Sequence, residues 1–151
     1  MFAMRTDPRQ NFSVVVSDVA RLLGRAFDRR ARQELKLSRA QVRLLAGIDR
    51  DPSGTPTQAA LAERMDMTPM AVAALCSRME CAGWIKREPS ATDRRAYVLT
   101  LTPKAHAVLA AAIRISDALQ AEVLAGLDKE EKDLLLRWLM SVRQKLVTRA
   151  S

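Results

Sequence analysis

The fold of this chain is decided by residues 57–102, which read TQAALAERMDMTPMAVAALCSRMECAGWIKREPSATDRRAYVLTLT. Two short helical patterns come first, and Asp66, Met67 and Thr68 form a tight turn between them. A stretch with an alternating period follows, which predicts the two strands of a hairpin. Helix, turn, helix and hairpin in this order predict a winged helix-turn-helix, a module whose second helix enters the major groove of DNA.

The second helix of this pair is marked at both ends. Thr68 is typical of an N-cap residue, because its hydroxyl can accept a hydrogen bond from a free N–H of the first turn. Pro69 follows at the position where a missing N–H costs nothing. Gly83 is the residue that most easily takes the chain out of a helix, so we expect the helix to end just before it.

The apolar stripe of this helix recurs with a period of 3.6 residues, which predicts the buried face: Val72, Leu75, Cys76 and Met79. The other face is predicted to meet DNA and contains Thr68, Met70, Ala71, Ala73, Ala74, Ser77 and Arg78. Alanine cannot form a hydrogen bond with a base edge. Direct reading would therefore depend on Met70, Ser77, Arg78 and contacts with thymine methyl groups, and recognition of DNA shape is expected to contribute.

A hairpin is predicted from strands at 84–88 and 97–101, and we call residues 84–101 the wing. Its loop, 89–95, is too long for a two-residue turn and too polar to be buried, so we expect it to project into solvent. Arg94 and Arg95 near the loop tip suit a narrow minor groove, where negative potential is concentrated. Asp93 is predicted to orient Arg95, and Arg87 on the first strand is a further candidate for DNA contact.

The loop and the second strand also carry a recognisable motif. Residues 93–95, DRR, followed by 99–102, LTLT, resemble the wing signature of the MarR family of bacterial transcriptional regulators. Residues 37–41, 58–64 and 68–83 resemble that family's second, third and recognition helices. The resemblance implies a homodimeric repressor that binds palindromic operator DNA and is released by a small lipophilic or aromatic-acid effector, or by an oxidant.

Long helices are predicted on both sides of this module, at 12–34, 38–49, 103–125 and from 128 onward. The first and last have apolar faces wider than one small domain needs, with Val19 and Leu22 in the first and Trp138 in the last. A shared dimer interface would bury these faces. The alternative is a monomeric bundle in which they cover only their own winged module.

The expected fold class is therefore mainly α with a small β-hairpin wing, a winged helix-turn-helix joined to long dimerisation helices. Residues 57–102 form the predicted DNA-binding module. Residues 11–56 and 103–149 form the predicted helical dimerisation region, and together these parts are expected to make one structural domain.

Composition favours a polyanionic partner. The 151 residues contain 25 Lys and Arg against 17 Asp and Glu, a net charge of +8, although a merely solubilising surface would give the same surplus. No uninterrupted apolar run is long enough for a membrane span, and the first ten residues lack the apolar core of a secretion signal. We expect a cytoplasmic protein with double-stranded DNA as its partner and no membrane association.

Two cysteines lie in the recognition helix region, at Cys76 and Cys81. On a continuous helix they point about 140° apart, so they cannot bridge each other. Cys76 belongs to the buried stripe, where cysteine is usually an inert small hydrophobe. Cys81, nearer the helix end, is the candidate redox thiol of an oxidant-sensing alternative.

The predicted effector site is a crevice implied by the family resemblance. Arg25 and Arg29 of the first helix could pair there with a ligand carboxylate. Their alternative is a solvated or phosphate-facing basic surface, which the neighbouring arginines of that helix fit at least as well.

Catalysis is not expected. His106 is the only histidine, and it has no cysteine, serine or carboxylate around it in a catalytic or metal-binding spacing. Five glycines in the whole chain form no phosphate-binding loop, so neither a metal nor a cofactor is predicted. The stronger competing function is a winged-helix protein that binds DNA without sequence preference or binds a protein partner, which the alanine-rich reading face would suit.

Overall fold

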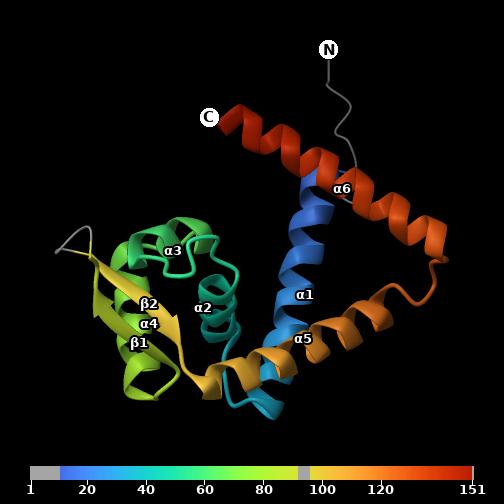
Figure 1. The fold of residues 1–151 in the computed structure, drawn as a ribbon. Coiled ribbons are helices and arrows are strands. Elements are labelled where there is room, and N and C mark those ends of the chain that lie inside the picture. Colours follow the sequence, from blue (N-terminus) through green and yellow to red (C-terminus); the bar gives the residue numbers. More distant parts are fainter. Residues whose placement is uncertain (1–10, 92–95, 151) are drawn as a thin grey trace. The chain divides into compact units, whose positions relative to one another are not determined.

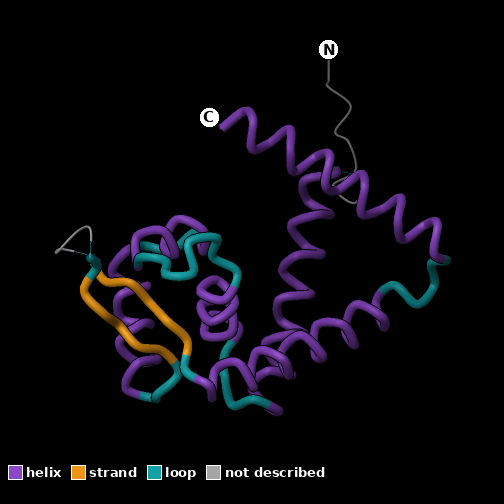
Figure 2. The backbone as a smooth tube through the Cα atoms, viewed as in Figure 1, coloured by secondary structure: helices purple, strands orange, loops and turns teal. Residues whose placement is uncertain are grey.

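The computed structural model describes residues 11–91 and 96–150. Its elements in chain order are α1 (Phe12–Glu34), α2 (Arg39–Asp49), α3 (Gln58–Met65), α4 (Pro69–Cys81), β1 (Ile85–Pro89), β2 (Tyr97–Leu101), α5 (Pro103–Val123) and α6 (Lys129–Ala150). Figure 1 shows this order along the chain, and Figure 2 separates the helices from the one small hairpin. The fold is mainly helical with a two-stranded antiparallel sheet, which confirms the predicted fold class. Over the described ranges, none of these helices combines the length and apolar character needed to cross a membrane.

The chain divides into two compact units, residues 1–116 and 117–151. The boundary between these units lies inside α5. A continuous helical pattern gives no local signal of where its packing against one unit ends.

Several helices begin at side-chain caps. The hydroxyl of Thr57 accepts from the Ala60 N–H at the start of α3, at 3.2 Å. At the start of α6, the Asp128 N–H donates to Glu131 Oε2 and the Glu131 N–H donates to Asp128 Oδ1, both at 2.9 Å. These pairs leave fewer free N–H groups in the first turns, which fixes where the helices begin.

The hairpin extends further than the sequence suggested. β1 begins at Ile85 and includes Pro89, and the Ser90 N–H donates to the Ala96 carbonyl at 2.9 Å. Ser90 is buried, so the expectation of a fully solvent-exposed loop from residue 89 was wrong at its start. Proline has no N–H to donate, but pairing can still continue past it through the next residue.

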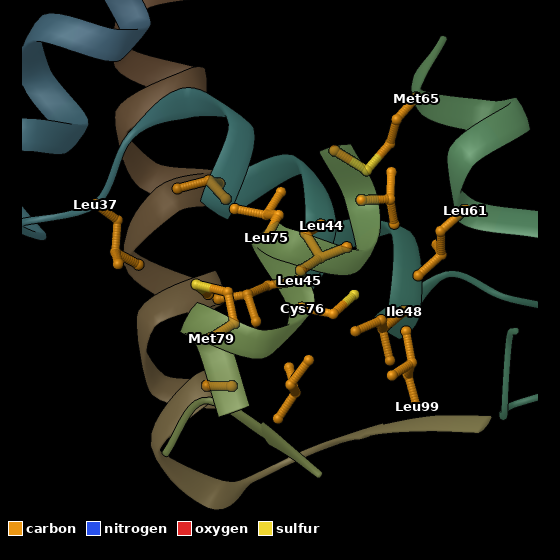
Figure 3. Close-up of a cluster of buried hydrophobic side chains, with 14 of the residues drawn as sticks. Leu37, Leu44, Leu45, Ile48, Leu61, Met65, Leu75, Cys76, Met79 and Leu99 are labelled. Atoms are coloured by element: carbon orange, nitrogen blue, oxygen red, sulfur yellow. The ribbon is translucent and has the colours of Figure 1, made fainter. Parts of the chain in front are cut away.

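The core of the first unit lies between α2, α3, α4 and the hairpin (Figure 3). All four residues of the predicted stripe on α4 are buried, which confirms the assignment of its inner face. They pack with a cluster whose largest fully buried members from the other elements are Leu44, Leu45, Leu61, Ile85 and Leu99. This packing holds α4 between its helical neighbours and the wing. The orientation of its outer face is therefore fixed by the core.

The segment between α2 and α3 is held by a buried carboxylate. Asp51 accepts hydrogen bonds from the backbone N–H of Ser53, at 2.8 Å, and from the Ser53 hydroxyl, and it forms an ion pair with Arg64 of α3. The Ser53 hydroxyl and then the Arg64 guanidinium hold the pKa of Asp51 below its usual value. The carboxylate therefore fixes α3 to the end of α2 in its charged form.

Replacing Asp51 with Asn is expected to lower stability at pH 7 and to flatten the acid side of the stability curve. A lowered pKa means that the carboxylate stabilises the fold above its unfolded pKa of about 3.9, and this contribution is lost as the pH falls through the folded value. Urea unfolding at pH 7 and pH 3 measures the difference. Asp28 and Glu80 also have lowered pKa values, so some acid loss should remain in Asp51→Asn. Wild-type and variant curves with equal acid slopes would contradict the assignment.

Candidate nucleic-acid interface

The turn before α4 sets the direction of that helix. Asp66 takes a left-handed backbone conformation with φ of 52°, and the Met67 N–H donates to the Ala62 carbonyl at 3.0 Å. The Thr68 hydroxyl then accepts from the Ala71 N–H at 3.2 Å, as predicted for the N-cap. This compact turn keeps α3 and α4 packed together, in the arrangement that a helix-turn-helix requires.

The predicted reading face of α4 divides into protruding and recessed side chains. Thr68, Met70, Ala74 and Arg78 are exposed, and the relative exposure of Met70 is 82%. The recessed members are half-buried: Ala71, Ala73 and Ser77. The helix thus presents one long apolar and one cationic side chain to solvent. Their contact with DNA stays a prediction.

The wing is anchored to the start of α3 as well as to its own partner strand. β1 and β2 pair antiparallel from Ile85 opposite Leu101 to Pro89 opposite Tyr97. The Leu99 N–H donates to the Pro56 carbonyl at 3.0 Å, beside an isolated bridge formed by Val98. The hairpin is therefore tied to the helix-turn-helix along its second strand.

The proposed wing tip, Asp93, Arg94 and Arg95, lies outside the described residues. The structure places only the strands that lead to it and away from it. The roles predicted for these three side chains accordingly remain predictions.

Arg87 has a partner inside the protein. Its Nε donates to Glu80 Oε2 at 2.7 Å, its Nη2 lies 2.6 Å from the same oxygen, and its backbone N–H donates to Oε1 at 3.2 Å. The guanidinium carbon also lies 5.9 Å from the centre of the Tyr97 ring. These hydrogen bonds hold the pKa of Glu80 below its usual value. Sequence reasoning treated Arg87 only as a DNA contact and missed Glu80 entirely.

A second group of contacts joins the end of α4 to the start of α5. The Thr102 hydroxyl donates to the Gly83 carbonyl at 2.8 Å, and Lys104 Nζ donates to the Ala82 carbonyl at 3.0 Å. Lys104 Nζ also lies 3.9 Å from the centre of the Trp84 ring, a cation–π contact. The hydroxyl and the ammonium group thus bind carbonyl groups of the two residues that follow α4, where the helix itself provides no donors.

Both cysteines are free, and their exposure matches the sequence-based assignment. Cys76 is buried, and burial raises the pKa of its thiol to about 11, which makes the reactive thiolate scarce. Cys81 is exposed at the end of α4. Accessibility alone does not establish oxidant sensing, so that role stays a prediction.

Arg25 and Arg29, the candidate effector ligands, are exposed on α1. Two surface hollows of the first unit are lined by other residues, one at the turn between α3 and α4 and one between α2 and α3. The pairing of Arg25 and Arg29 with an effector stays a prediction. His106 is exposed, and its Nδ1 lies 3.7 Å from Asp49 Oδ1.

A helix-turn-helix with a two-stranded hairpin packed beside its second helix defines a winged helix-turn-helix protein. Residues 35–96 match the sequence model of the MarR family. Over this stretch the chain is similar to the MarR family, as its wing motif and helix order had suggested.

A curated relative agrees with this similarity. Transcriptional regulator HosA of Escherichia coli O127:H6 is 39% identical over 80 residues, which is 53% of this chain and 59% of the relative. The match therefore spans little more than half the length of either protein.

Solved structures show the same fold over a greater length. A MarR mutant from E. coli complexed with operator DNA aligns with a TM-score of 0.76 and 19% identity, over 93% of this chain and 99% of that chain. The S. aureus MepR–DNA complex aligns with a TM-score of 0.75 and 19% identity, over 89% and 98%. At these identities the likeness establishes the fold alone.

Proposed function

We propose that this protein is a sequence-specific DNA-binding transcriptional regulator, cytoplasmic and without catalytic activity, which acts as a homodimeric repressor on palindromic operator DNA. The observation that carries the proposal is that one hydrophobic core packs against both α4 and the wing. The outer face of α4 is left facing solvent beside the wing. The net charge of +8 favours a nucleic-acid partner. HosA is named a transcriptional regulator, and MepR and the MarR mutant have been solved with DNA.

In the proposed complex, α4 lies in the major groove and the wing reaches the adjacent minor groove. Met70 and Arg78 are the long exposed side chains of the predicted reading face, and Ser77 supplies a half-buried hydroxyl. Arg94 and Arg95 enter the minor groove, and Asp93 orients Arg95. With so few hydrogen-bonding groups on α4, recognition depends strongly on groove shape.

Dimerisation is proposed because both units leave apolar helices uncovered. Every residue from 11 to 23 is exposed, including Val19 at 49% and Leu22 at 54%. In the second unit, Trp138 is 66% exposed and Leu146 is 62% exposed. Apolar surface this extensive marks an interaction site. A dimer would set two recognition helices about 34 Å apart, for half-sites roughly 10 base pairs apart centre to centre.

Release by a small lipophilic or aromatic-acid effector is part of the proposal. Such a ligand must bind the released state more tightly than the DNA-bound state, since a ligand with equal affinity for both shifts nothing. Arg25 and Arg29 are the proposed partners of its carboxylate. Cys81, which is exposed, is the site through which an oxidant would act in the alternative form of regulation.

Fluorescence anisotropy against the DNA upstream of the protein's own gene tests this function. We expect binding that resists excess scrambled DNA and weakens with salt, with a logarithmic slope of about 0.9 for each phosphate contacted. One compound in a panel of small aromatic acids should weaken it further. Equal affinity for scrambled DNA would support the non-specific alternative, and no binding at low salt would support a protein-interaction module.

A further inference from the structure

The contact between Glu80 and Arg87 joins the last turn of α4 to the middle of β1. One carboxylate accepts from the Arg87 guanidinium and from the backbone N–H of the same residue. The two side chains are only 35% and 27% exposed, so the pair is partly shielded from solvent. Two donor groups on one carboxylate fix direction as well as distance, which a single exposed ion pair does not do.

The position of this pair matters because the connection between helix and strand is short and bends sharply. α4 ends at Cys81 and β1 begins at Ile85, and Gly83 between them has a φ of 75°. Such a turn provides little rigidity of its own. Thr102 and Lys104 fix the base of the hairpin to this turn, whereas Glu80 and Arg87 act further along β1.

Arg87 also links the two strands. Its guanidinium lies over the ring of Tyr97, which begins β2, while it holds Glu80 on α4. A planar guanidinium can stack on a ring and bind a carboxylate at the same time, which an ammonium does less well. One side chain thus connects α4, β1 and β2.

We propose that Glu80 and Arg87 are positioning residues that set the angle of the wing on α4, so that both elements meet their grooves together. Neither side chain needs to touch DNA. The inference rests on the proposed DNA-binding function and specifies how its two reading elements are held in register. Arg87 then acts through Glu80 and Tyr97 rather than as a phosphate contact.

The change in net charge distinguishes a positioning role from no role, because the two predict opposite changes in DNA affinity. A carboxylate near DNA is repelled by phosphates, and Glu80→Gln would raise the net charge by one unit. If Glu80 only occupies the surface, the variant should bind operator DNA as well as wild type or more tightly. If Glu80 positions the wing, the same variant should bind more weakly.

The test compares Glu80→Gln with Glu88→Gln by anisotropy on operator DNA. Glu88 lies on β1 next to Arg87, is exposed, and gives the same change in charge when replaced by Gln. We expect Glu80→Gln to weaken binding by about 3- to 10-fold, a size typical of coupled neighbouring residues. Glu88→Gln should bind equally or more tightly. Equal or tighter binding by Glu80→Gln, with an unchanged melting temperature, overturns the proposal.

Arg87→Gln, introduced into wild type and into Glu80→Gln, distinguishes a positioning role of Arg87 from direct contact with DNA. If Arg87 acts through Glu80, its replacement should weaken wild type but cost little more in Glu80→Gln. If Arg87 binds a phosphate itself, its loss should lower the salt slope by about 0.9 in each background, which would contradict the proposal.

Amide hydrogen exchange provides a measurement without DNA. The Arg87 N–H donates to Glu80, so its exchange should become faster in Glu80→Gln while core amides stay protected. Faster exchange with unchanged operator affinity would show a structural pair with no role in DNA binding. Wild-type protein that does not prefer operator over scrambled DNA would instead contradict the proposed function, whatever the exchange data show.

Discussion

Replacing Arg94 and Arg95 together with alanine is expected to weaken operator binding by about 2 to 6 kcal/mol, that is by roughly 30-fold or more. Each guanidinium is predicted to enter a minor groove, where it is worth about 1 to 3 kcal/mol. Anisotropy titrations on operator DNA measure the loss. The melting temperature should stay unchanged, since the polar tip of the loop is predicted to project into solvent.

Two controls separate groove insertion from bulk charge. Lys129→Ala with Arg149→Ala removes the same charge at the two ends of α6, where both side chains are exposed, and should cost much less. Arg94→Lys with Arg95→Lys keeps the charge but replaces weakly hydrated groups with strongly hydrated ones, so its affinity should be intermediate. Equal losses in the two alanine pairs would refute a specific role for the wing tip.

The helices were well predicted because their signals are local. α1 runs from Phe12 to Glu34 as expected, and the predicted cap Thr68 accepts a backbone N–H, as Ser38 and Asp128 do at the starts of α2 and α6. A cap and a periodic apolar stripe depend on residues within one or two turns, which a sequence displays directly. The inner face of α4 followed from its stripe alone.

The site was predicted less completely because its contacts cross between elements. Glu80 and Arg87 are seven residues apart, and only the bend at Gly83 brings them together. Lys104 of α5 contacts the Ala82 carbonyl only because the hairpin brings the chain back to the end of α4. No periodic pattern in the sequence predicts such pairs. The hydrogen bond from Ser90 to Ala96, which continues the hairpin, also depends on the path of the opposite strand.

Introducing two charges on α1, Val19→Glu with Leu22→Glu, is expected to give a monomer and to weaken binding to a full palindromic operator by about 100-fold or more. Both side chains are exposed and apolar, and burying two carboxylates in an interface is costly. A dimer binds its second half-site intramolecularly, an advantage of about 10² to 10⁴ that a monomer loses. Light scattering after size-exclusion chromatography, combined with anisotropy, measures both effects.

Ser17→Glu is the matched control, because Ser17 lies on the opposite side of α1 from the predicted apolar face and is also exposed. It should stay dimeric. A duplex with a single half-site distinguishes loss of the partner from damage to the reading elements: the double variant and wild type should bind it with similar affinity, since α4 and the wing are untouched. A wild-type monomer at micromolar concentration, or a monomeric variant with full operator affinity, would show that the apolar face of α1 serves some other contact.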